Sequence, residues 1–197
     1  GQLDNVSSCK SPHMMLGALA KSYFADKIDV RPEDMYVVSI MPCTAKKYEI
    51  TRPEMVNDGV RNVDAVLTTR ELAKMIKEAG IEFTELENGE FDNPLGISTG
   101  AADIFGTTGG VMEAALRTVY EIVTGRELPF EGLHVTPIVG LDRVKTAGIT
   151  IEDAKEEWSF LNGVTVNIAV TSGLVGAGML LEEIKKGESP YLFIEVM

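Results

Sequence analysis

The chain has 197 residues and a formal net charge of −12, from 30 acidic side chains against 18 lysines and arginines. This acidity disfavours nucleic acids and anionic membrane surfaces as partners, and the hydrophobic content of 45% argues against disorder. No apolar run approaches the roughly 20 residues that a membrane-spanning helix needs.

Cysteine usage and the first residues bear on the cellular compartment. Cys9 and Cys43 are the two cysteines of the sequence, too few for the disulfide framework of a secreted protein. The polar N-terminus lacks the charged-then-apolar pattern of a signal peptide. We therefore predict a reducing, cytoplasmic location. Both ends of the sequence look cut, since Gly1 opens directly into a polar loop and an apolar run stops at Met197.

The first half of the chain predicts helices and short strands. Ser11 is expected to N-cap a helix that has Pro12 in its first turn. An apolar run predicts a buried strand that Pro42 ends. A polar excursion and a second short strand follow, and then a helix that Thr69 caps and Gly80 ends. The predicted elements are helix 13–25, strand 35–41, strand 64–69 and helix 69–80, with the polar excursion over 50–63.

The second half alternates strands and helices, after an acidic stretch over 81–96 that is typical of a solvated loop. Glycines precede a strong helix, and such a loop either binds an anion at the helix N-terminus or packs closely against neighbouring backbone. Pro137 favours an edge position for its strand. The alternation predicts an α/β fold. The predicted strands are 133–141, 163–173 and 190–197, and the predicted helices are 111–124, 149–158 and 174–187.

Cys43 lies just beyond the predicted strand 35–41, at the end where open α/β sheets bind ligands. Lys46 and Lys47 follow closely, and nearby positive charge favours the thiolate, which is the metal-binding and nucleophilic form. These residues alone leave two interpretations open. Cys43 is either a functional thiol or an inert buried cysteine.

Five segments of the chain carry a resemblance to one known family. They are SSCKSP (7–12), MPCTAKKYE (41–49), DGVRNVDAVLTTRELAKMIK (58–77), IFGTTGGVMEAALR (104–117) and FIEVM (193–197). In this order they resemble the catalytic domain of the iron-only ([FeFe]) hydrogenases, and MPCTAKKYE looks like that family's second signature, MPCxxKxxE. The resemblance covers essentially the whole sequence.

The resemblance implies a fold, a cofactor and a reaction. The fold is α/β, with two small lobes of mainly parallel sheets flanked by helices and a cluster site between them, here approximately residues 1–97 and 98–197. The cofactor is the H-cluster, in which a cysteine bridges a [4Fe–4S] cubane to a two-iron centre carrying CO, cyanide and a dithiolate. The reaction is the reversible oxidation of dihydrogen to protons and electrons.

The resemblance also implies roles for single residues. Cys43 matches one of four cysteines that ligate the cubane, whereas Cys9 matches a position that is not a ligand. Lys46 matches the cation that hydrogen-bonds a cyanide, and Ser7 matches a hydroxyl of the proton path. The remaining matched positions lie around the cofactor: Ser11, Met41, Phe105, Gly106 and Met197.

The sequence departs from the family pattern in two places. The first cysteine signature and the third cysteine signature are absent, so an internal fragment of the domain is expected. One thiolate of four would bind a cubane weakly. We therefore expect these 197 residues by themselves to hold no intact H-cluster and to be inactive.

Several alternatives remain at this stage. A related family assembles cytosolic iron–sulfur proteins without turning over hydrogen, sensory hydrogenase-like proteins signal instead of catalysing, and a metal-free scaffold is the non-enzyme interpretation. For a hydrogenase, the expected partners are ferredoxin-like domains or redox subunits, an NADH-linked complex, and maturation proteins. His13 and His134 are expected to be surface or packing residues and not ligands.

Overall fold

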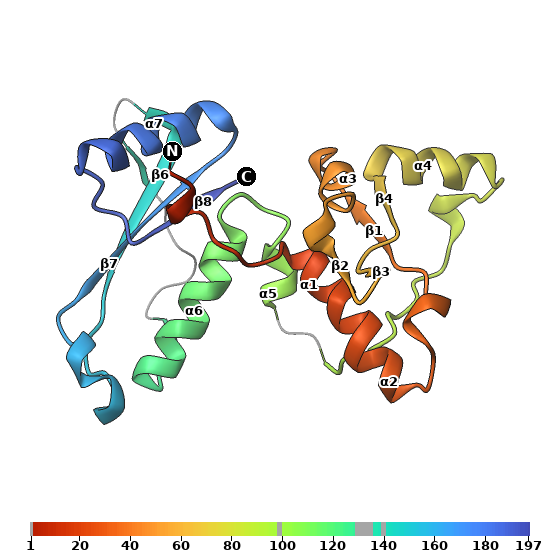
Figure 1. The fold of residues 1–197 in the computed structure, drawn as a ribbon, viewed down its shortest axis with the longest axis horizontal. Coiled ribbons are helices and arrows are strands. Elements are labelled where there is room, and N and C mark those ends of the chain that lie inside the picture. Colours follow the sequence, from red (N-terminus) through yellow and green to blue (C-terminus); the bar gives the residue numbers. More distant parts are fainter. Residues whose placement is uncertain (1, 98–99, 129–135, 139–140) are drawn as a thin grey trace. The chain divides into compact units, whose positions relative to one another are not determined.

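The computed structural model describes residues 2–97, 100–128, 136–138 and 141–197 (Figure 1). The chain splits into two compact units. We call residues Val6–Ile97 the N unit, and Gly1–Asn5 together with Ser98–Met197 the C unit. No helix in the described ranges is long and apolar enough to cross a membrane.

The N unit contains two pairs of strands. β1 and β4 pair in parallel, with Met41 opposite Thr68 at their carboxyl ends. β2 and β3 form a small antiparallel hairpin whose turn, Asp58 and Gly59, has positive φ angles at both residues. The strands are β1 (Val38–Met41), β2 (Val56–Asn57), β3 (Val60–Arg61) and β4 (Ala65–Thr68).

Helices of the N unit pack against these strands around a small core. Gly17 allows α1 to approach closely, because a Cβ at this position would lie 2.4 Å from the carbonyl oxygen of Asn62. The core consists of Met14, Ile50, Met55, Val63 and Val66, with Val37 and Met41 packed against it. The helices are α1 (Pro12–Leu19), which continues through a π-helical turn (Ala20–Phe24) into α2 (Ala25–Lys27), then α3 (Ala45–Glu49) and α4 (Thr69–Glu78).

The C unit is built on a four-stranded sheet in the order β5-β6-β7-β8. β5 pairs antiparallel with β6 and β6 with β7, whereas β8 lies parallel to β7. The strands are β5 (Thr136–Ile138), β6 (Leu141–Thr150), β7 (Thr165–Thr171) and β8 (Phe193–Val196). The helices are α5 (Ala101–Ile104), α6 (Gly110–Thr124) and α7 (Leu174–Lys186), with a 3-10 helix at Glu156–Leu161.

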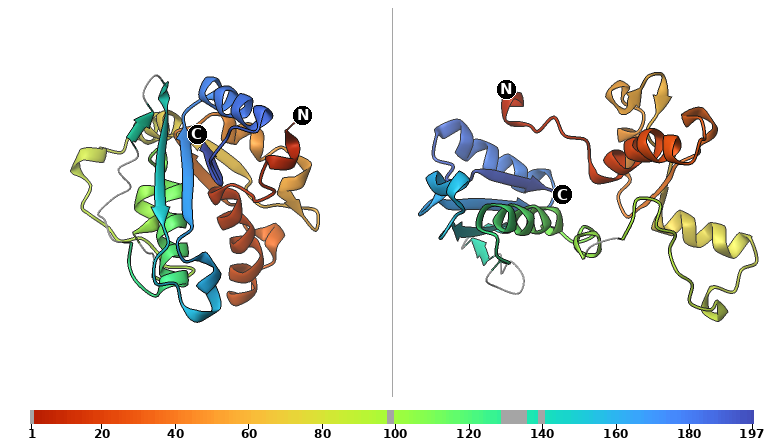
Figure 2. Two further views of the ribbon diagram at one scale, coloured as in Figure 1. Left: turned by 90° about the vertical axis from the view of Figure 1, so that its left-hand side faces the viewer. Right: turned by 90° about the horizontal axis from the view of Figure 1, so that it is seen from below.

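Two helices cover opposite faces of this sheet (Figure 2, right). Met112 of α6 packs against Ile168 and Val170 of β7. Leu180 of α7 packs against Ala169, the residue between those two. Because side chains alternate between the faces of a strand, α6 and α7 sandwich β7.

The α/β class and the small sheets flanked by helices are confirmed, but the pairing is less parallel than expected. Two of the five strand pairings in the described residues are parallel, β1 with β4 and β7 with β8. The other three are antiparallel. A two-residue turn joins β2 to β3, and residues 151–164, which include the 3-10 helix Glu156–Leu161, join β6 to β7. Neither connection is the crossover α-helix that usually joins parallel neighbours.

Several predicted boundaries need correction. The strand expected over 35–41 begins only at Val38 and is half exposed, with Val38 and Ile40 open to solvent. The helix α4 is capped by Thr68, which forms a capping box with Glu71, and not by Thr69. The short helix expected over 149–158 begins at Glu156, since residues 149 and 150 end β6.

Other predictions match the structure closely. The helices over 111–124 and 174–187 are present, and Gly125 and Gly187 end them with positive φ angles of 73° and 74°. Strand 163–173 appears as β7, and strand 190–197 as β8. Of the strand expected over 133–141, residues 133–135 and 139–140 lie outside the described residues. The remainder forms β5 and the first residue of β6, and β5 ends the strand order at one edge.

Candidate functional site

The loop that carries Cys43 follows the carboxyl end of β1. β1 ends at Met41, and α3 begins at Ala45. The Cys43 thiol is free and exposed, so it is not a buried cysteine. Met41, two residues earlier, is partly buried and packs against the core of the N unit. The exposed thiol thus lies between the end of a strand and a helix that carries two lysines.

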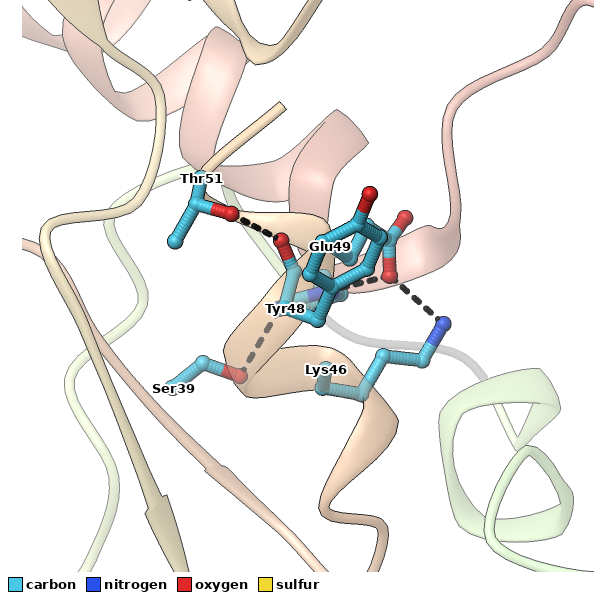
Figure 3. A network of polar contacts seen from close by, with 6 residues as sticks. Ser39, Lys46, Tyr48, Glu49 and Thr51 are labelled. Atoms are coloured by element: carbon cyan, nitrogen blue, oxygen red, sulfur yellow. Dashed lines mark hydrogen bonds and ion pairs between the residues drawn. The ribbon is translucent and has the colours of Figure 1, made fainter.

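Lys46 belongs to a polar network centred on Glu49 (Figure 3). The Lys46 ammonium lies 2.7 Å from Glu49 Oε2, and the His13 ring nitrogen Nε2 lies 3.1 Å from the same oxygen. The other ring nitrogen of His13, Nδ1, lies 3.1 Å from Ser39 Oγ. One carboxylate oxygen therefore joins α3 to α1, and the imidazole joins both to β1.

The Glu49 carboxylate is strongly held in its charged form. Burial in itself raises its pKa. Hydrogen bonding by Lys46 and His13, together with the nearby polar hydroxyl of Ser11, outweighs burial and lowers the pKa from 4.5 to about 2. The Glu49 carboxylate, close to the Cys43 loop, is therefore ionised at neutral pH.

Ser11 occupies the N-cap position of α1, as expected, with Pro12 in the first turn. Its side chain makes no capping hydrogen bond. The Ser11 Oγ atom is buried, faces the Glu49 carboxylate and has no partner of good hydrogen-bond geometry among the described residues. The Ser11 hydroxyl therefore lies near the polar network but is hydrogen-bonded neither to it nor to the helix end.

Lys47, the neighbour of Lys46, makes a separate ion pair. Its ammonium lies 2.7 Å from a carboxylate oxygen of Glu71 on α4. The hydrogen bond from Lys47, with those from the backbone and side chain of Thr68, lowers the pKa of Glu71 to about 2. The two lysines of the motif thus serve different carboxylates.

The glycine-rich segment of the C unit is tied to β8 by a second glutamate. Glu195 Oε1 accepts a hydrogen bond from the backbone N–H of Gly109 at 3.1 Å, and Oε2 accepts one from Met112 at 2.7 Å. A carboxylate at a helix N-terminus is favourable because it meets free N–H groups and the positive end of the helix dipole. The anion at this helix N-terminus is therefore a side chain of the chain itself.

Close backbone approach also explains the glycines. A Cβ at Gly110 would lie 1.7 Å from the carbonyl oxygen of Ile104, and Gly109 has a φ of 90° as the N-cap of α6. Phe105 ends α5 and is half-buried, and Gly106 follows it in an exposed turn. Of the two interpretations of this segment, close backbone packing is supported.

Ser7 and Met197 lie near the ends of the described chain. Ser7 is exposed, and its Oγ accepts a hydrogen bond from the Cys9 N–H at 3.1 Å. The backbone of Met197 extends the ladder of β8, donating to Thr171 and accepting from Gly173, while about half of the residue is exposed. Ser7, Ser11, Met41, Cys43 and Lys46 belong to the N unit, and Phe105, Gly106 and Met197 to the C unit.

Sequence reasoning missed several residues of the site. His13 was expected to be a surface or packing residue; its side chain is buried, with 7% exposed, but its hydrogen bonds at both ring nitrogens were not anticipated. The i, i+3 spacing of Lys46 and Glu49 was a usable signal for their pairing on a helix. No local signal existed for His13 or for Glu195, whose partners lie far away in the sequence.

The donor set was compared with the H-cluster that the resemblance implies. The described residues contain no group of three or more His, Cys, Asp or Glu side chains placed to hold a metal ion. A cubane requires four thiolates, and the sequence has two cysteines. Cys43 has the donor type of a cubane ligand, and the cysteines of the sequence do not supply the whole ligand set.

Comparison with known proteins identifies relatives along the full sequence. A family model described as the C-terminal domain of the iron-only hydrogenase large subunit matches residues 1–197. The periplasmic [Fe] hydrogenase large subunit of Nitratidesulfovibrio vulgaris is 48% identical over 195 residues, 99% of this chain and 44% of that protein. The NADP-reducing hydrogenase subunit HndD of Solidesulfovibrio fructosivorans is 47% identical over 195 residues, 99% of this chain and 31% of that protein.

A more distant relative has a different description. A probable cytosolic Fe-S cluster assembly factor of Nematostella vectensis is 32% identical over 198 residues, 99% of this chain and 43% of that protein. Among solved structures, an [FeFe]-hydrogenase HydA1 variant of Chlamydomonas reinhardtii gives a TM-score of 0.83 at 43% identity, over 98% of this chain and 53% of that one. The chain thus spans about half or less of the length of these relatives.

Proposed function

Because the chain belongs to the iron-only hydrogenase large subunit family, we propose that it forms part of the catalytic domain of an [FeFe] hydrogenase. The reaction would be the reversible oxidation of dihydrogen to protons and electrons. The observation that carries the proposal is the match of the family model to all 197 residues. The proposal is also supported by the chemistry of the Cys43 loop, which places a thiol just after β1 and the Lys46 ammonium on the following helix, α3.

The chain's own residues would supply binding and orientation. Cys43 would provide one thiolate of the cubane, and the H-cluster would supply the redox chemistry when bound. Lys46 would hold a cyanide ligand by a charge-assisted hydrogen bond. An ammonium has three N–H donors, and Glu49 engages one of them, so donors remain for an anionic ligand.

The other site residues are proposed by the same resemblance. Ser7 is exposed and carries a hydroxyl, which suits a member of a proton path. Ser11 and Met41 would line the cofactor from the N unit. Phe105, Gly106 and Met197 would line it from the C unit, where the exposed turn at Gly106 allows close approach of a ligand to the backbone.

Taken by themselves, the 197 residues are proposed to hold no intact H-cluster and to be inactive. The sequence has two cysteines against the four thiolates of a cubane. The proposal is tested by anaerobic reconstitution of the 197-residue chain with iron and sulfide, iron analysis and a hydrogen-evolution assay. Four irons per chain with steady turnover would contradict it.

The proposed role of Lys46 is tested in the full large subunit that contains this sequence. Lys46→Gln should lower hydrogen turnover by about a hundredfold, the typical loss when one preorganised donor to a reacting centre is removed. Lys47→Gln is the matched control, because Lys47 pairs with Glu71 and not with the Glu49 network. Equal losses from both substitutions would contradict the role.

An iron–sulfur assembly function is the second candidate, and the relative at 32% identity is the observation that favours it. The hydrogenase proposal is preferred because the hydrogenase relatives are 48% and 47% identical over a similar length. Hydrogen evolution by the full subunit separates the two, since an assembly factor would bind clusters without producing hydrogen. A sensory hydrogenase-like protein would show turnover far below that of the hydrogenase relatives in the same assay.

Partners and location follow from the same relatives as proposals. Redox subunits or ferredoxin-like domains would exchange electrons with the domain, and maturation proteins would load the cluster. A subunit of an NADP-reducing hydrogenase among the relatives supports a nicotinamide-linked complex. A cytoplasmic location stays a prediction, against which stands one relative described as periplasmic.

A further inference from the structure

We infer that His13 is a positioning residue for Lys46, acting through the Glu49 carboxylate. The inference concerns how the chain orients this ammonium, and its meaning for an anionic ligand at the Cys43 loop rests on the function proposed above. Neither the family signature nor the sequence pattern assigns His13 any part, because the signature ends at Glu49 and His13 lies on another helix.

The Lys46–Glu49 pair alone would orient Lys46 poorly. The two residues are three positions apart on α3, a helix of five residues. Pairs of this spacing on a helix surface are only weakly stabilising, and side-chain entropy opposes a single geometry. An additional anchor on the carboxylate is therefore needed to fix the ammonium.

His13 supplies that anchor from α1. Its Nε2 lies 3.1 Å from Glu49 Oε2, the same oxygen that Lys46 meets at 2.7 Å. With 7% of its side chain exposed, His13 is more deeply buried than Glu49 at 16% or Lys46 at 27%. The most buried member of the network therefore holds the carboxylate, and the most exposed member is the ammonium.

Ser39 on β1 fixes the imidazole in turn. His13 Nδ1 and Ser39 Oγ lie 3.1 Å apart, so both ring nitrogens are engaged. In the neutral ring, Nε2–H donates to Glu49 and Nδ1 accepts from the Ser39 hydroxyl; in the charged ring, both nitrogens donate. The ring keeps the same orientation in either state, so the network ties three separate elements together.

Charge balance supports this arrangement. Lys46 and Glu49 neutralise each other, and His13 gives Glu49 a second hydrogen-bonding partner. Lys46 can therefore direct its remaining N–H groups to an anion without leaving Glu49 unsatisfied. Lys47 has no share in this network, because its ammonium pairs with Glu71 on α4.

The experiment measures the exchange of lysine ammonium protons with water by ¹⁵N NMR in the full large subunit that contains this sequence, prepared without metal. In His13→Leu, exchange at Lys46 should rise about tenfold, since losing a hydrogen bond to a charged group is worth roughly that factor. Exchange at Lys47 should not change. In His13→Gln, whose amide can again donate to Glu49 and accept from Ser39, exchange at Lys46 should return close to that of the unsubstituted chain.

Ser39→Ala provides an independent variant, which also serves if His13→Leu does not fold. It should raise exchange at Lys46 by about threefold, because only the support of the ring is lost. Because the chain carries no metal in this measurement, its result is separate from the hydrogen-turnover assays that test the proposed function. The inference is overturned if Lys46 exchange is unchanged in folded His13→Leu or in Ser39→Ala, or if Lys46 and Lys47 rise together.

Discussion

Two glutamates, each within a segment that resembles the hydrogenases, are held in different ways. Glu49 of MPCTAKKYE is held by side chains, the Lys46 ammonium and the His13 imidazole. Glu195 of FIEVM is held by backbone, the N–H groups of Gly109 and Met112. Side-chain donors can be exchanged by single substitutions, whereas backbone donors depend on the whole turn. In the N unit, single substitutions can therefore change the contacts of Glu49. In the C unit, the hydrogen bonds of Glu195 form a fixed connection between a glycine turn and a strand.

Gly110→Ala breaks the fixed connection most severely. The new Cβ would lie 1.7 Å from the backbone oxygen of Ile104, so the turn that presents the Gly109 N–H to Glu195 must move. We expect a loss of about 4 kcal/mol of unfolding free energy, above the usual cost of overpacking because the obstacle is backbone. Urea unfolding of the purified chain measures it.

Gly178→Ala in α7 is the matched control for that substitution, because a Cβ there meets nothing within 4 Å. It should raise stability by up to about 1 kcal/mol through helix propensity. Equal losses at the two glycines would show that close approach at Gly110 does not matter.

Lys21→Met tests whether side-chain ion pairs hold the N unit. The Lys21 ammonium lies 2.7 Å from Asp64, whose carboxylate also accepts from the Val37 N–H at 2.7 Å. Removing the lysine leaves a largely buried carboxylate without its counter-charge, for an expected loss of about 3 kcal/mol. Lys74→Met is the control, since its pair with Glu78 is exposed on both sides, and it should change stability by less than about 0.5 kcal/mol. A loss below 1 kcal/mol for Lys21→Met would contradict the role of this pair.

Glu195→Ala removes the carboxylate from the start of α6. The expected loss is about 2 kcal/mol, because two charge-assisted hydrogen bonds at a helix N-terminus disappear. Hydrogen exchange at the Gly109 and Met112 amides should accelerate selectively. Glu195→Gln should lose about half as much, since its single amide oxygen can accept only part of the pair. If the protection of both amides from hydrogen exchange is unchanged, Glu195 does not hold them by hydrogen bonds.

The smallest expected effect is the pH dependence contributed by Glu49. Its pKa is about 2 in the folded chain against an ordinary 4.5, so its stabilisation is fully present above pH 4.5 and is lost as pH falls toward 2. After allowance for solvent screening we expect a change of about 1 kcal/mol across this window. Glu49→Gln should remove that part of the pH dependence, and parallel profiles for the two chains would contradict the assignment.

The sequence allowed the regular helices to be predicted well, because their signals are local. Helices α6 and α7 have apolar periodicity, and Gly125 and Gly187 mark their ends. Strand β6 was missed, because Leu141–Thr150 contains charged residues and a glycine and owes its conformation to pairing with β7. The β2–β3 hairpin was missed although Asp58 and Gly59 are a common hairpin turn.

Members of the candidate site that lie close together in the sequence were predictable, and members that lie far apart were not. The Cys43 loop and Lys46 lie in one motif, and their position after β1 was anticipated. His13 reaches Glu49 across 36 positions, and Lys21 reaches Asp64 across 43. Such pairs depend on how helices pack on strands, which neither spacing nor composition encodes locally.

The central claim is that Cys43 is a ligand of an iron–sulfur cubane in the full large subunit. Its most direct test compares the cubane EPR signal and the iron content of subunits carrying Cys43→Ser or Cys9→Ser, prepared anaerobically side by side. Both cysteines are free and exposed, so the two substitutions are closely matched. We expect Cys43→Ser to lose or strongly alter the cubane signal and Cys9→Ser to retain it. An unaltered signal in Cys43→Ser, or its loss only in Cys9→Ser, would show that Cys43 is not a ligand of the cubane.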